Sequence, residues 1–332
     1  MRKNLFIYLT GVVLMCQAVK TEAQQESHYT QFMYNKLLIN PGFSGTRRVP
    51  SITALYRNQW VGFDGHPQSY LLSADGSLFG ERLGGGVTLA NQETGIIKNQ
   101  FANGALSYAI IHTESATIRV GLNGAVRRYT FDVNNPNVYV RERQDQALQT
   151  GDKTAQTYGN LGAGIYFDYK ELYAGFSVPN LYKNDIGLNP SRSVVEIAKE
   201  QNHIYFMAGG FIKVANDIHL KPSVLGKYVK NAPFSVDLNL NVVFKRKFSG
   251  GASYRFGQTG GDSVDFLAFV QATDNMGIGV AYDFTLSKIK NYSTGTFEAL
   301  IRYDIFRKVK KATDKKGGSN IKNTLSNPRF FF

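Results

Sequence analysis

Histidine is scarce in this sequence, and cysteine occurs once, at Cys16. Its histidines show neither an H-x-x-x-H spacing nor a zinc-ligand spacing, and they are scattered: His28, His66, His112, His203 and His219. A serine hydrolase on an outer wall would need Ser and His within hydrogen-bond reach. Ser177 and His203 fall on neighbouring expected strands, which chance alone would produce. The sequence therefore predicts no catalytic residue, no metal site and no cofactor.

Two glycine-rich runs are candidates for phosphate-binding loops, and their positions in the expected strands test this possibility. They are Leu-Gly-Gly-Gly at 83–86 and Asn-Met-Gly-Ile-Gly at 275–279. Both lie inside expected strands rather than at a strand-to-helix turn, where a phosphate-binding loop would stand. Glycine within a strand marks a close approach of another backbone. These runs therefore predict close-packing positions.

The first 23 residues have the character of a secretory signal peptide. Arg2 and Lys3 precede a mostly apolar stretch at 5–19, and Thr-Glu-Ala at 21–23 offers a cleavage site. A lipoprotein signal is the alternative, but Met15 stands before Cys16 where that signal needs a small residue. Because Cys16 is the only cysteine, the mature chain from residue 24 onward is expected to have no thiol chemistry and no disulfide.

The net charge of +13 is unevenly distributed. The tail at 307–332 holds eight basic residues against Asp314 alone, and nucleic acid is an unsuitable partner for an exported chain. We expect a periplasmic tail that docks a partner through its last residues, Pro328, Arg329, Phe330, Phe331 and Phe332. A solvated tail, or an insertion signal centred on Phe332, is the alternative.

Alternation of apolar and polar residues dominates the chain after Pro50 and predicts an all-β protein. In the stretch 234–244, for example, Phe, Val and Leu alternate with Ser, Asp and Asn. About fourteen such segments can be counted: 51–58, 68–75, 83–91, 100–111, 116–126, 160–168, 171–178, 202–214, 217–228, 233–244, 247–256, 262–272, 275–284 and 296–306. An even number suits an antiparallel bacterial barrel.

A soluble β-sandwich would show the same alternation, so loop lengths provide a further test. No apolar run beyond the signal approaches the ~18 residues of a spanning helix, so a membrane position requires a closed barrel. In a barrel with both termini in the periplasm, odd-numbered connections are extracellular and often long. The long connections at 59–67, 179–201 and 285–295 agree with this rule. The long stretch 127–159 and the tight turn at 168–170 are expected to agree with it only if the number of strands counted before them is changed by one.

The polar face of the strands predicts a lumen lined by mixed charges, since fourteen strands enclose more space than side chains fill. The expected lining residues are Arg57, Arg119, Lys221, Lys227, Asp237, Arg255, Asp283, Glu298, Arg302 and Asp304. Ion pairing that holds the wall together is the favoured interpretation, and a selective conduit is the alternative. The barrel itself is expected over residues 51–306.

The segment at 24–50 differs from the rest because apolar and aromatic residues crowd into it. A helix of this content would bury most of its surface. We expect a short plug inside or against the periplasmic mouth; a site that grips a partner is the alternative.

Several blocks of the sequence resemble the PorP/SprF family of Bacteroidota. HYTQFMYNKLLINPGFSGTRR (28–48) and LYRNQWVGFDGHPQSYLLSADGSL (55–78) resemble the family's opening. Its later blocks are similar, in the same order, to LGAGIYFDYKELYAGFSVPNL (161–181), LKPSVLGKYV (220–229), GGASYR (250–255), GIGVAYDFTLSKI (277–289) and NPRFFF (327–332).

The resemblance implies an outer-membrane component of type IX secretion, acting with the gliding machinery where a cell glides. It implies three kinds of partner: outer-membrane lipid, the secretion machinery, and a large secreted surface protein with a type B C-terminal domain, which the barrel would help to deliver or anchor. A pore for small solutes and an outer-membrane lipid enzyme are the other candidate functions.

Overall fold

The structure is a computed structural model, and it describes residues 27–47, 49–132, 154–187, 196–257 and 260–305. The expected signal peptide at 1–23 and the basic tail at 307–332, with its candidate docking residues 328–332, lie outside the described residues. No helix in the described part of the chain is long and apolar enough to cross a membrane.

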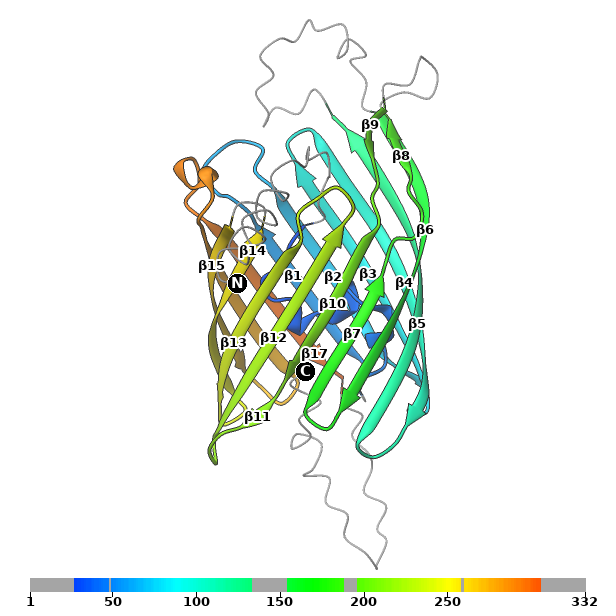
Figure 1. The fold of residues 1–332 in the computed structure, drawn as a ribbon, viewed down its shortest axis with the longest axis vertical. Helices are drawn as coiled ribbons and strands as arrows, with labels where there is room; N and C mark the ends of the chain where they lie inside the picture. The colour runs from blue at the N-terminus through cyan, green and yellow to red at the C-terminus, as the bar shows by residue number, and fades with distance from the viewer. Residues whose placement is uncertain (1–26, 48, 133–153, 188–195, 258–259, 306–332) are drawn as a thin grey trace, which may run out of the picture.

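Fourteen antiparallel strands form a closed barrel (Figure 1). The wall consists of β1 (Ser51–Asn58), β2 (Gln68–Phe79), β3 (Leu83–Thr94), β4 (Ile97–His112), β5 (Ala116–Phe131), β6 (Thr154–Tyr169), β7 (Leu172–Val178), β10 (His203–Gly210) with its continuation β11 (Ile212–Lys213), β12 (Ile218–Val229), β13 (Ser235–Phe244), β14 (Phe248–Gly257), β15 (Gly260–Gln271), β16 (Met276–Thr285) and β17 (Thr296–Asp304). β10 and β11 count as one wall strand because both pair with β12. Each of the fourteen segments expected from the sequence is confirmed.

Neighbouring strands along the chain pair with each other, and the pairing of the last strand with the first closes the wall. β17 returns to β1, where Ser51 lies opposite Asp304, and β10 pairs with both β7 and β12. A small separate sheet, β8 (Asp185–Gly187) with β9 (Glu196–Lys199), stands in the connection between β7 and β10. A closed wall leaves no unpaired sheet edge around the barrel, which the absence of water in a membrane requires.

The outer surface of the wall is apolar and its interior is polar. On β13, Leu240 is 50% exposed while Asp237 is 3% exposed, the reverse of the order in a soluble protein. Aromatic residues near strand ends, such as Phe244 and Phe256, are likewise about half exposed. An exposed apolar band with aromatic residues near strand ends is typical of an outer-membrane barrel, so this protein is one.

The connections differ in length between the two mouths of the barrel. The even-numbered connections are tight turns of at most four residues, at 80–82, 113–115, 170–171, 214–217, 245–247 and 272–275. The odd-numbered connections, at the opposite mouth, include 59–67, 179–202 and 286–295. We call these ends the even mouth and the odd mouth; the odd mouth is uppermost in Figure 1.

The connection between β5 and β6 is the fifth, so it belongs to the odd mouth without any shift in strand count. The prediction that this connection fits only after the strand count is changed by one was wrong. The connection is also shorter than expected, because β5 continues to Phe131 and β6 begins at Thr154. Both strands extend past the ends that alternation alone suggested.

The N-terminal segment 27–47 lies inside the barrel as a plug (Figure 1). It forms three single turns of 3-10 helix rather than one helix: η1 (Phe32–Tyr34), η2 (Lys36–Leu38) and η3 (Pro41–Phe43). A fourth short helix, η4 (Lys288–Asn291), stands at the odd mouth. The plug crosses the lumen, because Arg47 contacts Asp75 near the start of β1 whereas Ser27 lines a hollow at the odd mouth.

Orientation in the membrane can be tested by cysteine labelling. Because long connections belong outside, Asp64→Cys at the odd mouth should react with an impermeant maleimide on intact cells. Asn216→Cys in an even-mouth turn should react only after the outer membrane is permeabilised. Both side chains are exposed, so unequal reactivity reports sidedness and not burial. The opposite pattern would reverse the orientation.

Candidate functional site in the barrel lumen

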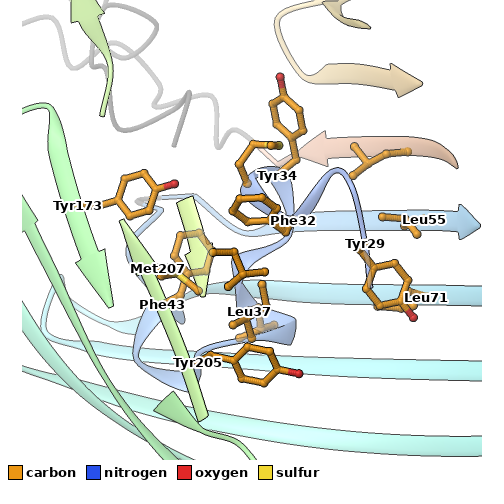
Figure 2. Close-up of a cluster of buried hydrophobic side chains, with 14 of the residues drawn as sticks. Tyr29, Phe32, Tyr34, Leu37, Phe43, Leu55, Leu71, Tyr173, Tyr205 and Met207 are labelled. Atoms are coloured by element: carbon orange, nitrogen blue, oxygen red, sulfur yellow. The ribbon is translucent and has the colours of Figure 1, made fainter. Parts of the chain in front are cut away.

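The plug packs its apolar side chains against the inner wall. Figure 2 shows plug residues Tyr29, Phe32, Tyr34, Leu37 and Phe43 among wall residues Leu55, Leu71, Tyr173, Tyr205 and Met207. Met33 and Phe32 are 0% and 2% exposed. The plug thus supplies the hydrophobic core that the polar inner face of a large barrel cannot provide alone.

All ten charges that the sequence placed in the lumen are buried. They are Arg57, Arg119, Lys221, Lys227, Asp237, Arg255, Asp283, Glu298, Arg302 and Asp304. Seven of them form ion pairs with one another, and the other three make contacts elsewhere on the inner wall. Burying a charge costs free energy unless the charge is paired and hydrogen-bonded. These contacts are therefore needed to stabilise the interior of the barrel.

Arg57 forms ion pairs with two carboxylates of the inner wall. Its Nη1 lies 2.9 Å from Asp283 Oδ2 and also contacts Glu298 Oε1. Thr30 of the plug joins this group: its hydroxyl donates to Asp283 at 2.8 Å, and its backbone N–H donates to Glu298 at 2.7 Å. The Gln31 N–H donates to the second Glu298 oxygen at 3.0 Å. Wall charges and plug backbone therefore form one network.

Arg255 extends the network around the wall. It lies 2.5 Å from Asp237 and 4.0 Å from both Asp265 and Asp283. His28 of the plug lies 3.8 Å from Asp237. The sequence prediction did not include Asp265, although it shares the inward parity of the expected strand at 262–272, and that parity was the signal available.

A second group of charges lies toward the even mouth. Arg302 lies 3.3 Å from Asp304, and the Lys221 Nζ lies 4.2 Å from the centre of the Tyr34 ring. Tyr34 stacks on Phe269 with ring centres 4.4 Å apart. These contacts hold the first plug turn to strands on the side of the barrel opposite η3.

Two of the expected lumen charges stand apart from both groups. Arg119 donates to the Arg82 carbonyl oxygen at 3.1 Å and to Ser107 Oγ at 3.3 Å. The Lys227 Nζ lies 6.0 Å from the Tyr205 ring centre. The structure therefore divides the ten residues among several places instead of lining one path.

Lys36 forms a contact that sequence reasoning missed. Its Nζ lies 3.5 Å from the Tyr173 ring centre and 5.5 Å from that of Phe43, and it donates to the Tyr166 hydroxyl at 3.3 Å. Burial lowers the pKa of the Lys36 ammonium well below its usual range. Aromatic faces replace part of the lost hydration. The available signal was its position, since Lys36 is the only lysine or arginine within the apolar stretch 29–43.

Glycines of the wall let the plug backbone approach closely. A Cβ at Gly121 would overlap backbone atoms of Pro41 and Gly42, and one at Gly84 would overlap the Ser44 carbonyl. A Cβ at Gly164 would overlap the Asn40 side chain. Gly84 belongs to the run at 83–86, so the expected close-packing role is confirmed there.

Among the described residues, the cavity between the plug and the wall is small. A cavity of about 40 Å³ lies between the plug and the wall, enough for a few water molecules. At the odd mouth a vestibule of about 230 Å³ is lined by Ser27, Arg127, Tyr129, Ile186, Glu200 and His203. Arg127 and Glu200 form an ion pair there at 3.4 Å. The vestibule ends on the plug, since Ser27 forms part of its floor.

The Ser177 and His203 pair does not form a hydrolytic dyad. Both side chains are buried on the inner face, and the Ser177 hydroxyl donates to the Ile39 carbonyl at 2.7 Å. His203 Nδ1 contacts the Gln201 carbonyl at 2.9 Å. Among the described residues, no group of three or more His, Cys, Asp or Glu is placed to hold a metal ion.

Comparison with protein families gives a match over residues 21–303 to the model described as "Type IX secretion system membrane protein PorP/SprF". Comparison with curated proteins gives no match. Similar solved structures include a Pseudomonas aeruginosa FadL homologue, at 10% identity over 83% of this chain and 94% of that one with a TM-score of 0.49. Another is the KdgM porin, at 10% identity over 77% and 99% with a TM-score of 0.36. A third is the P. putida toluene transporter TodX, at 10% identity over 81% and 93% with a TM-score of 0.47.

Proposed function

Because the chain belongs to the PorP/SprF family of type IX secretion system membrane proteins, we propose that it is a non-enzymatic barrel that assists delivery or surface anchoring of a large secreted protein. Family membership implies partners in the secretion machinery. The kind of secreted protein that the barrel serves is a further part of the proposal.

The plugged lumen is the observation that supports this function best. A solute channel needs a continuous polar path, but the residues of η1 to η3 are almost all buried against the wall. Seven of the ten charges expected in the lumen are instead paired with one another, and Asp283 and Glu298 also accept hydrogen bonds from Thr30 of the plug. A barrel built in this way suits a scaffold that holds partners at its two mouths.

The odd mouth is the proposed place for the secreted partner. The β8–β9 sheet stands beside the vestibule there, and Glu200, which follows β9, ties it to the wall through its ion pair with Arg127 of β5 and by accepting from Asn160 of β6 at 3.0 Å. Beside the sheet, the exposed side chains of Tyr182, Lys183 and Asp185 combine an aromatic ring with charges of both signs. Such a mixed polar and apolar surface can recognise a folded protein domain.

The remaining partners follow from the same proposal. Outer-membrane lipid surrounds the apolar outer wall. The secreted protein is proposed to carry a type B C-terminal domain, and the secretion or gliding machinery is proposed to contact the even mouth. The candidate docking residues 328–332 lie outside the described residues, so their role stays a prediction.

A deletion in the native host tests the proposed function. Cells that lack the protein should lose one or a few large proteins from their surface, while other secreted proteins and the uptake of small solutes stay normal. The missing proteins should co-purify with a tagged wild-type barrel. Normal surface proteins combined with impaired solute uptake would contradict the proposal and favour a pore.

A further inference from the structure

Basic residues concentrate on one sector of the even mouth. Three turns meet there: 170–171, 214–217 and 245–247. The turns are joined by hydrogen bonds from Phe211 N–H to the Glu171 carbonyl and from Lys245 N–H to the Asp217 carbonyl. This sector carries five cations, which are Lys170, Lys213, Lys245, Arg246 and Lys247. Its acids are only Glu171 and Asp217, so the sector has a net charge of about +3.

The lysines of this sector sit at the edge of the lipid-facing wall. The Nζ atoms of Lys245 and Lys247 lie 5.2 and 5.7 Å from the ring centres of Phe244 and Phe248. These rings are 45% and 51% exposed on the outer wall. Aromatic rings near strand ends mark the height at which hydrocarbon gives way to headgroups. The two ammonium groups therefore lie at the level of lipid phosphates.

Lys170 repeats this arrangement on a different turn. Its Nζ lies 5.3 Å from the centre of the Tyr169 ring, which is 42% exposed on the outer wall. Among the described residues, Lys170, Lys213, Lys245 and Lys247 have no ion-pair partner. The protein thus leaves these four charges unneutralised at the membrane interface.

The turn at 245–247 carries its cations on a backbone conformation that is unfavourable for their residue types. Lys245 and Arg246 have φ angles of 50° and 53°, and the Lys247 N–H donates to the Phe244 carbonyl at 3.0 Å. Two successive left-handed residues at the centre of a β-turn favour Asn-Gly, because side chains with a Cβ disfavour that conformation. Two cations thus occupy turn positions whose backbone conformation favours other residues.

We propose that this basic sector binds the phosphate of anionic phospholipids, such as phosphatidylglycerol, in the leaflet around the even mouth. The lysines supply charge-assisted hydrogen bonds to phosphate oxygens, and the neighbouring rings lie against the acyl chains. The inference does not depend on the proposed role in secretion. It assigns a lipid-binding surface to a part of the barrel that the plug and its ion pairs do not use.

The double substitution Lys245→Asn/Arg246→Gly separates lipid binding from folding. It removes two cations and supplies the residues that the turn prefers, so the barrel should be at least as heat-stable as the wild type in phosphatidylcholine nanodiscs. Phosphatidylglycerol binding, measured by native mass spectrometry of the full mature chain, should weaken by roughly tenfold or more. Lys245→Arg/Lys247→Arg should keep wild-type binding.

Lys288→Gln/Lys290→Gln is the matched control, because it removes two cations from η4 at the opposite mouth. Its phosphatidylglycerol binding should equal that of the wild type. Equal binding by the control and by Lys245→Asn/Arg246→Gly would overturn the proposal. Unchanged lipid binding together with loss of a co-purifying periplasmic protein would overturn it as well and assign the sector to a protein partner.

Discussion

Replacing Arg57 with Met should destabilise the barrel by about 3–5 kcal/mol, because it leaves the buried Asp283 and Glu298 carboxylates without their shared cation. Arg57 is 2% exposed, so water cannot replace the lost contact without reorganisation of the plug. The measurement is urea unfolding in detergent, followed by the heat-modifiable shift of the folded band on a gel. The plug should loosen together with the wall, since Thr30 bonds to both carboxylates.

Two controls separate charge from packing in this experiment. Arg57→Lys keeps a cation that can occupy the position of Nη1, so it should lose clearly less stability than Arg57→Met. Arg128→Met removes an exposed arginine of the same barrel and should change stability by no more than about 0.5 kcal/mol. A loss below about 1 kcal/mol for Arg57→Met would mean that the interior is hydrated, contrary to the buried network described above.

The substitution Gly121→Val should displace the plug and turn a closed barrel into a conducting one. A side chain at this position would overlap the backbone of Pro41 and Gly42 in η3, which cannot rotate away as a flexible side chain could. Overpacking of this kind costs about 1–3 kcal/mol when neighbours yield. Planar-bilayer recordings should change from no steps in the wild type to discrete openings in the variant.

Gly104→Val provides the matched control, because Gly104 lies on β4 and a Cβ added there would meet no atom within 4 Å. It should remain closed and fold normally. Conductance in the wild type equal to that of Gly121→Val would show that the plug does not seal the lumen, and the pore function would then be favoured. A closed Gly121→Val barrel of normal stability would show that η3 tolerates displacement.

Several structural features were predictable because they depend on local chemistry. Alternation along 234–244 is enough to decide that Leu240 faces lipid and Asp237 faces inward, since strand geometry sends successive side chains to opposite faces. The same rule predicted ten charged residues on the inner face, and all ten are buried. Strand ends were less predictable: β5 and β6 continue past the membrane band, where alternation no longer separates lipid from water.

The sequence by itself determined the barrel class, the approximate place of each strand and which side of each strand is polar, because period-two patterning and turn chemistry act between near neighbours. Only the tertiary structure decided which charges meet and what fills the lumen. Thr30 and Glu298 are 268 positions apart along the chain, and they touch because the wall closes between β1 and β17 around the plug. Such contacts depend on closure and register of the whole barrel, which no short segment of sequence encodes.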